Sequence, residues 1–350
     1  MYQRWSALDR LRGVALVGML IHHLTEWMAG DARTILPGWQ SFAVTDVAAV
    51  AFFVAAGASL GLFVSSRRAR GTSRGRVATQ VLRRYGLLVP IGLTLDWVFW
   101  RHPAMFGVLE ALGVAVVAAA AVAAVIPDRL LPAAAAITVA GGMVAERLAT
   151  GHAGWWADEF LAGKFPAVTY VGFVLVGVAV VRSGRYLDRR WAMAAAGIGV
   201  AATVALLLVG VAPDRYPGDL AFVIPGLAGT AIVYALAETA LLGPFDVVVR
   251  RAAAHTLGIF VAHYFIYGGL RYLGVLGDVP DLVAVPAAVA VAAALCLVAP
   301  KVPQPAWSAR TGRRRPRPAP LGAAGWDPVD RGDQPGGIVD RDPQLTDARP

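Results

Sequence analysis

Long apolar runs alternate with short polar segments over the first 300 residues of the chain. A helix needs about 20 mainly apolar residues to cross roughly 30 Å of hydrocarbon, and ten runs approach that length. The pattern therefore predicts an all-α, polytopic membrane protein, with one domain of about ten transmembrane helices over residues 1–300. The ten predicted spans are residues 11–29, 43–65, 85–100, 105–126, 130–148, 165–181, 191–212, 219–242, 252–275 and 281–300.

Residues 301–350 have a different composition. Nine of the 22 prolines fall here, without apolar periodicity, and a basic stretch from Arg310 to Arg317 precedes an acidic end. Such a segment buries too little apolar area to offset its chain entropy. We expect a disordered cytoplasmic tail whose basic start lies against anionic lipid headgroups.

The composition excludes a water-soluble globule. Hydrophobic residues make up 57% of the chain and charged residues 16%, against roughly 45–50% and about 25% in soluble domains. The net charge of +9 comes from short clusters of basic residues between apolar runs. No basic face with interleaved aromatic residues is visible, so no nucleic-acid partner is predicted. Cys296 is the single cysteine, which excludes a disulfide framework, and no Cys/His spacing indicates a metal site.

The arginines and lysines predict the orientation. If the N-terminus lies inside, the inner segments carry 17 of these residues and the outer segments carry 6. Because positive residues concentrate in cytoplasmic segments, both termini are predicted in the cytoplasm. The expected location is the cytoplasmic (inner) membrane of a bacterium, in contact with membrane lipids.

The first span contains ionisable residues, which are costly in hydrocarbon and usually functional. Arg12 and His23 are eleven residues apart, which places them on one helix face and roughly 16 Å apart along the axis. A phosphorylated donor can dock at the arginine with its reactive end near the imidazole. His23 then acts as a general base or accepts an acyl group itself. His22 points about 100° away. The plainer alternatives are a topology role for Arg12 and a packing role for one histidine.

Four acids lie in or beside the predicted spans: Glu26, Asp46, Asp96 and Glu110. Glu26 lies one helical turn from the histidines and can orient an imidazole, and Asp46 can do so from a neighbouring helix. Asp96 and Glu110 are predicted to bind the substrate. Each acid has a structural alternative, as a helix cap or as a partner of Arg101.

Several motifs resemble those of known membrane acyltransferases. Motifs in the first, second, third and ninth spans resemble, in sequence and in order, those of the acyltransferase-3 proteins. The opening segment and residues 43–47 are similar to the heparan-α-glucosaminide N-acetyltransferase-like branch. Both belong to the transmembrane acyltransferase superfamily. The segments that carry the resemblance are Arg12 with His23, Phe52-Phe53-Val54-x-x-Gly57, Arg83-Arg84, Ala262-His263-Tyr264-Phe265, Ala7-Leu8-Asp9-Arg10-Leu11-Arg12-Gly13 and Ala43-Val44-Thr45-Asp46-Val47.

The resemblance implies acyl transfer from cytoplasmic acyl-CoA, with acetyl-CoA as co-substrate and no permanently bound cofactor. It implies an extracytoplasmic acceptor, a hydroxyl or amine of an envelope glycan, an exported sugar or a secondary metabolite. His23 takes the central catalytic role beside Arg12, and Arg83 and Arg84 help to hold the CoA phosphates. Residues 31–40 contain no histidine, a departure from the heparan-type enzymes, whose active histidine lies in the loop after the first span.

Two other classes of function stay open from the sequence. Ten helices with buried histidines and acids also suit a transporter or flippase for a small or lipid-linked molecule, although no internal repeat is visible. A family member with a non-catalytic role, such as a scaffold whose basic tail recruits partners, is the third alternative.

Overall fold

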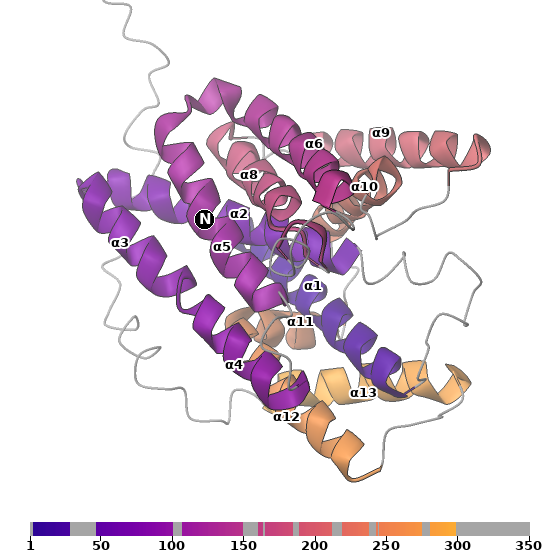
Figure 1. Ribbon diagram of the computed structural model, residues 1–350. Helices are drawn as coiled ribbons and strands as arrows, with labels where there is room; N and C mark the ends of the chain where they lie inside the picture. The colour runs from indigo at the N-terminus through magenta and orange to yellow at the C-terminus, as the bar shows by residue number, and fades with distance from the viewer. Residues whose placement is uncertain are drawn as a thin grey trace, which may run out of the picture. The chain divides into compact units, whose positions relative to one another are not determined.

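The computed structural model describes residues 3–28, 47–100, 107–149, 160–163, 165–184, 189–211, 219–237, 243, 245–274 and 281–298. Over these residues all regular structure is helical, which confirms the predicted all-α class (Figure 1). The predicted tail, 301–350, lies outside them. The helices are α1 (Gln3–Met28), α2 (Val47–Arg68), α3 (Arg74–Tyr85), α4 (Leu88–Trp100), α5 (Val108–Val125), η3 (Asp128–Leu130), α6 (Leu131–Ala149), α8 (Ala167–Arg182), α9 (Arg189–Leu208), α10 (Leu220–Ala237), α11 (Phe245–Ala254), α12 (Thr256–Tyr272) and α13 (Asp281–Val298).

The length and hydropathy of its helices identify the protein as a membrane protein. In the part of the chain that is described, five helices are long and apolar enough to cross a bilayer, and α8 and most of α13 are shorter apolar helices. Each of the ten predicted spans overlaps at least one helix, while the number of crossings stays a prediction. The five long helices are Val47–Arg68, Val108–Val125, Asp128–Ala149, Arg189–Leu208 and Leu220–Ala237.

The structure differs from the predicted spans in three places. α1 begins at Gln3, well before residue 11. The arginine-rich segment after α2 contains a helix, α3, because Val77 and Val81, one turn apart, are buried and α3 packs on α5. Figure 1 shows α3 and α4 following each other nearly end to end. The predicted span 252–275 is divided into α11 and α12 by a break at His255.

α2 lies at the centre of the helical unit and α9 at its edge. α2 packs on α1, α5, α8 and α10, whereas α9 packs mainly on α10. Within the most apolar stretch of 18 residues in each helix, 78% of the residues of α2 are buried, against 6% of those of α9. Ile198 and Leu208 of α9 are 72% and 82% exposed, as expected for side chains that face lipid.

Glycines allow α2 and α8 to cross closely. A Cβ added at Gly177 on α8 would stand 2.6 Å from the Ala58 nitrogen of α2, and one added at Gly57 would overlap the Val174 carbonyl. Small residues at such crossings bring backbones close enough for strong packing in a membrane. Around this crossing, Phe53 of α2 packs edge-on against Tyr170 of α8, with 4.4 Å between ring centroids.

The α6–α8 contact provides a stability prediction with a matched control. A Cβ at Gly142 would stand 2.5 Å from the Thr169 nitrogen, whereas one at Gly141 meets nothing within 4 Å. We expect Gly142→Ala to lower the free energy of unfolding by about 1–3 kcal/mol through overpacking. Gly141→Ala should raise it by up to about 1 kcal/mol through helix propensity. Unfolding of the two variants in one detergent checks this, and equal stabilities would contradict the close crossing.

Candidate active site

α1 carries four of the residues predicted to form the site. Its core face is built from leucines, and Leu16 and Leu20 are fully buried. Helix α1 packs on α11, α12 and α13 as well as on α2 and α10. Its first half meets α11 where Arg12 bonds to the Ala253 carbonyl. Beyond Leu20 it meets α12, where His23 bonds to His263. The polar residues therefore lie along a helix that is enclosed by the C-terminal helices. The four predicted residues are Arg12, His22, His23 and Glu26.

A histidine pair joins α1 to α12. The Nδ1 atom of His23 and the Nε2 atom of His263 are 2.9 Å apart, in hydrogen-bond contact. His263 is 1% exposed, and its other ring nitrogen, Nδ1, contacts the carbonyl oxygen of Phe260 one turn earlier on α12. The two imidazoles and the carbonyl thus form one continuous chain of hydrogen bonds.

The carbonyl at the end of this chain determines where the protons lie. A carbonyl oxygen only accepts, so Nδ1 of His263 must carry the hydrogen. In a neutral pair the Nε2 atom of His263 is then the acceptor, and Nδ1 of His23 donates to it. The remaining lone pair of His23 is on Nε2. The carbonyl of Phe260 therefore holds the His23 imidazole in the tautomer that a general base or nucleophile at Nε2 needs.

Aromatic rings surround the histidine pair. The ring of Tyr264 lies 4.4 Å from that of His263 and 6.3 Å from that of His23, centroid to centroid. The hydroxyl of Tyr267 donates to the Leu20 carbonyl at 3.2 Å, a second link between α12 and α1 less than one turn before His23. These contacts restrict the movement of both imidazoles. His22 is half-buried beside His23, with 5.7 Å between the ring centroids.

Arg12 lies at the junction of α1 and α11. Its Nη2 atom donates to Asp9 Oδ1 at 2.8 Å and to the Ala253 carbonyl at 2.9 Å. Ala253 is in the last turn of α11, where the carbonyls lack helical partners and a cation is favourable. Arg12 and His23 therefore both contact the α11–α12 segment. The observed bonds favour an anchoring role for Arg12, and its role toward a donor stays a prediction.

The structure brings Asp96 of α4 and Glu110 of α5 together. Both are buried, at 5% and 1% exposure, and their carboxyl groups lie close together, because a Cβ added at Gly107 would stand 3.0 Å from Glu110 Oε2 and 3.2 Å from Asp96 Oδ2. One turn further along α4, the Phe99 ring lies 5.9 Å from the Tyr264 ring of α12. Phe99, on the same helix as Asp96, therefore connects α4 to the aromatic rings around the histidine pair.

Arg83 and Arg84 are not joined to the histidines by any contact among the described residues. Arg83 and Arg84 are exposed near the end of α3, and the Arg84 guanidinium lies 5.7 Å from the Tyr85 ring centroid. Asp46 lies outside the described residues, and so does the side chain of Glu26.

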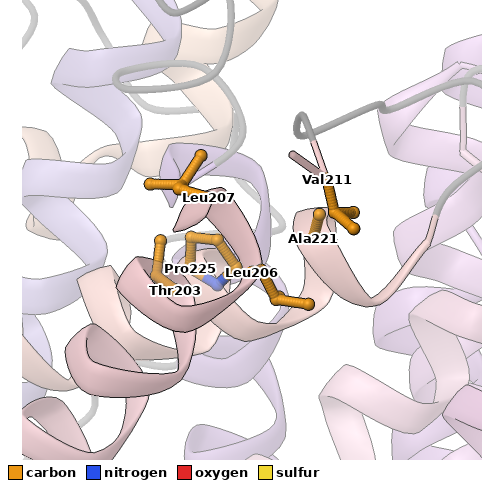
Figure 2. A pocket seen from close by; sticks show the side chains of 6 residues that line it. All are labelled: Thr203, Leu206, Leu207, Val211, Ala221 and Pro225. Atoms are coloured by element: carbon orange, nitrogen blue, oxygen red, sulfur yellow. The ribbon is translucent and has the colours of Figure 1, made fainter. Parts of the chain in front are cut away.

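A small hollow between α9 and α10 carries no candidate chemistry (Figure 2). Its lining is apolar except for Thr203, whose hydroxyl donates to the Gly199 carbonyl at 2.8 Å, and it leaves no room for a water molecule. Pro225 within α10 contributes one wall. The lining residues are Thr203, Leu206, Leu207, Val211, Ala221 and Pro225.

His263 is a candidate site residue to which the sequence alone assigned no role. The sequence does contain a feature that indicates such a role, because His263 lies inside an apolar span, where ionisable residues are usually functional. Its partner was not predictable, since periodicity within α12 does not say which helix packs beside it.

Comparison with known proteins identifies the family. Residues 4–211 match the family model described as "Heparan-alpha-glucosaminide N-acetyltransferase, catalytic". The matched segment is more than half of the 350 residues. No curated protein matches the sequence. The match supports the heparan-type branch of the resemblance and does not extend to the acyltransferase-3 family. His263 lies beyond the matched segment. The chain belongs to the heparan-α-glucosaminide N-acetyltransferase catalytic family, a family of membrane acetyltransferases.

Proposed function

We propose that this protein transfers an acetyl group from acetyl-CoA to an amine or hydroxyl, with His23 as the catalytic residue. The observation that carries the proposal is the bond between His23 Nδ1 and His263 Nε2, with His263 in turn held by the Phe260 carbonyl. That arrangement leaves the lone pair of His23 on Nε2. Membership of an acetyltransferase family supplies the reaction class.

In the general-base route, Nε2 of His23 takes a proton from the acceptor as its nitrogen or oxygen attacks the thioester carbonyl. A new C–N or C–O bond forms, the C–S bond breaks, and the proton passes to the departing CoA sulfur. The Nδ1–H of the resulting imidazolium is stabilised by its bond to His263.

In the covalent route, Nε2 attacks the thioester carbonyl itself and CoA leaves, so that the acetyl group is carried on His23. The acceptor then attacks this acetyl-imidazole and restores the free histidine. Both routes use the same lone pair. Rapid denaturation near neutral pH after incubation with labelled acetyl-CoA in the absence of acceptor separates them, because only the covalent route leaves label on the protein.

We place the donor on the arginine-rich side, which the positive-inside rule assigns to the cytoplasm, together with both termini. Arg83 and Arg84 are exposed guanidinium groups of the kind that bind phosphates, and Arg12 lies nearer the histidines along α1. The membrane in this proposal is the cytoplasmic membrane of a bacterium.

The proposed acceptor is an extracytoplasmic glycan or small molecule with an amine or hydroxyl. The name of the matched family indicates a terminal glucosamine amine as the first acceptor to test. Asp96 and Glu110 are proposed to bind the acceptor, and His22, Glu26 and Asp46 are proposed to assist His23 in catalysis.

The test is CoA release by the purified protein in detergent. With acetyl-CoA alone we expect slow release of CoA from hydrolysis, and faster release when glucosamine is added. A thiol reagent measures the CoA, and mass spectrometry measures the acetylated amine. Failure to bind or consume acetyl-CoA under both conditions would overturn the proposal, and uptake assays in proteoliposomes would then test the transporter alternative.

A further inference from the structure

A second candidate site lies away from the histidines, between α2, α3, α5 and α8. These helices enclose a pocket of about 350 Å³. Arg68 ends α2, Arg74 begins α3 and Arg182 ends α8, so the arginines gather at one end of the pocket. The deeper walls are apolar, formed by Leu60, Val64, Val77, Val81, Val117 and Val178.

Only one of these three arginines has an acidic partner in the described residues. Arg182 donates to Asp128 Oδ1 at 2.7 Å and to the Ala123 carbonyl at 2.8 Å. Arg68 and Arg74 are exposed, and no acidic side chain lines the pocket. Two guanidinium groups that have no acidic partner among the described residues, at the end of an apolar pocket, suit a ligand with an anionic head and a hydrocarbon chain.

The exposed surface of α3 is also basic. Val77 and Val81 are buried, and α3 contains no acidic residue. Because these valines belong to the hydrophobic core of the helical unit, the exposed part of α3 is basic, and exposed arginines are attracted to anionic headgroups. The four arginines of α3, all exposed, are Arg74, Arg76, Arg83 and Arg84.

We propose that this pocket binds one anionic phospholipid, with the phosphate at Arg68 and Arg74 and an acyl chain between the apolar walls. A phosphate of CoA has the same head chemistry, but the lining residues come from α2, α3, α5 and α8. None of them comes from α1 or α12, which carry His23 and His263. The pocket therefore suits a lipid that stays in place better than a donor that must reach the histidines.

Lipid retention by the purified full-length protein tests this inference. The protein is exchanged into detergent with phosphatidylglycerol or phosphatidylcholine, and bound lipid is counted by native mass spectrometry. We expect one phosphatidylglycerol to be retained in preference to phosphatidylcholine. Arg74→Gln should weaken retention about 5-fold and the Arg68→Gln/Arg74→Gln double variant about 30-fold. Arg76→Gln, also on α3 but outside the pocket lining, is the matched control and should retain lipid like the wild type.

Three results would overturn the inference: equal retention of the two lipids, equal loss in the control and the pocket variants, or displacement of phosphatidylglycerol by acetyl-CoA. The last result would reassign the pocket to the donor. Because the measurement counts bound lipid, its failure is separate from any failure of acetyl transfer.

Discussion

Replacing His23 with alanine is expected to lower kcat for acetyl transfer by about 10²- to 10⁴-fold, the contribution of a positioned general base. The lone pair on Nε2 has no substitute in the alanine variant, whichever of the two routes operates. Binding of acetyl-CoA should be nearly unchanged, because the donor phosphates are proposed to bind arginines. Steady-state CoA release and equilibrium binding, measured on the same preparation, separate the two effects.

A second histidine serves as the control for this experiment. His255 lies at the break between α11 and α12 and makes no side-chain capping bond to α12. His255→Gln should keep wild-type turnover. Undiminished transfer by His23→Ala, or equal losses in the two variants, would contradict a catalytic role for His23.

Replacing His263 with leucine is expected to lower kcat by roughly 10²-fold, the lower end of a general-base contribution. Leucine removes the acceptor for His23 Nδ1–H, so the imidazole is no longer held with its lone pair on Nε2. His263 is a positioning residue, and the KM for acetyl-CoA should therefore change little. A kcat loss with an unchanged KM is the signature to measure.

His263→Gln distinguishes positioning from simple damage to the core. Glutamine can offer its side-chain oxygen to His23 Nδ1–H and should recover part of the lost kcat. Leucine is the more apolar replacement at a site that is 1% exposed. If His263 only filled the core, the leucine variant would therefore be more active than the glutamine variant. Higher activity of the leucine variant than of the glutamine variant would contradict the positioning role.

Much of the fold was predictable because hydrocarbon thickness imposes a length on apolar runs. The predicted run 130–148 and helix α6 differ by one residue at each end. α3 was missed because its arginines give the segment the composition of a loop, although Val77 and Val81 have helical spacing. The break at His255 was missed because the apolar run continues through it.

The candidate site was predictable only within single helices. Spacing places Arg12 and His23 on one face of α1, and both contact the α11–α12 segment. Pairings between helices, His23 with His263 and Asp96 with Glu110, depend on tertiary packing that periodicity does not encode. Asp96 and Glu110 were nevertheless in consecutive predicted spans, which a short connection tends to place side by side.

The measurement that tests the central claim most directly is acetyl transfer across a membrane. Wild-type and His23→Ala proteins are reconstituted in vesicles with labelled acetyl-CoA on one side and glucosamine on the other. We predict labelled N-acetylglucosamine on the acceptor side for the wild type, and at least about 10²-fold less for His23→Ala. No labelled product from the wild type, or equal product from the two proteins, would contradict the account.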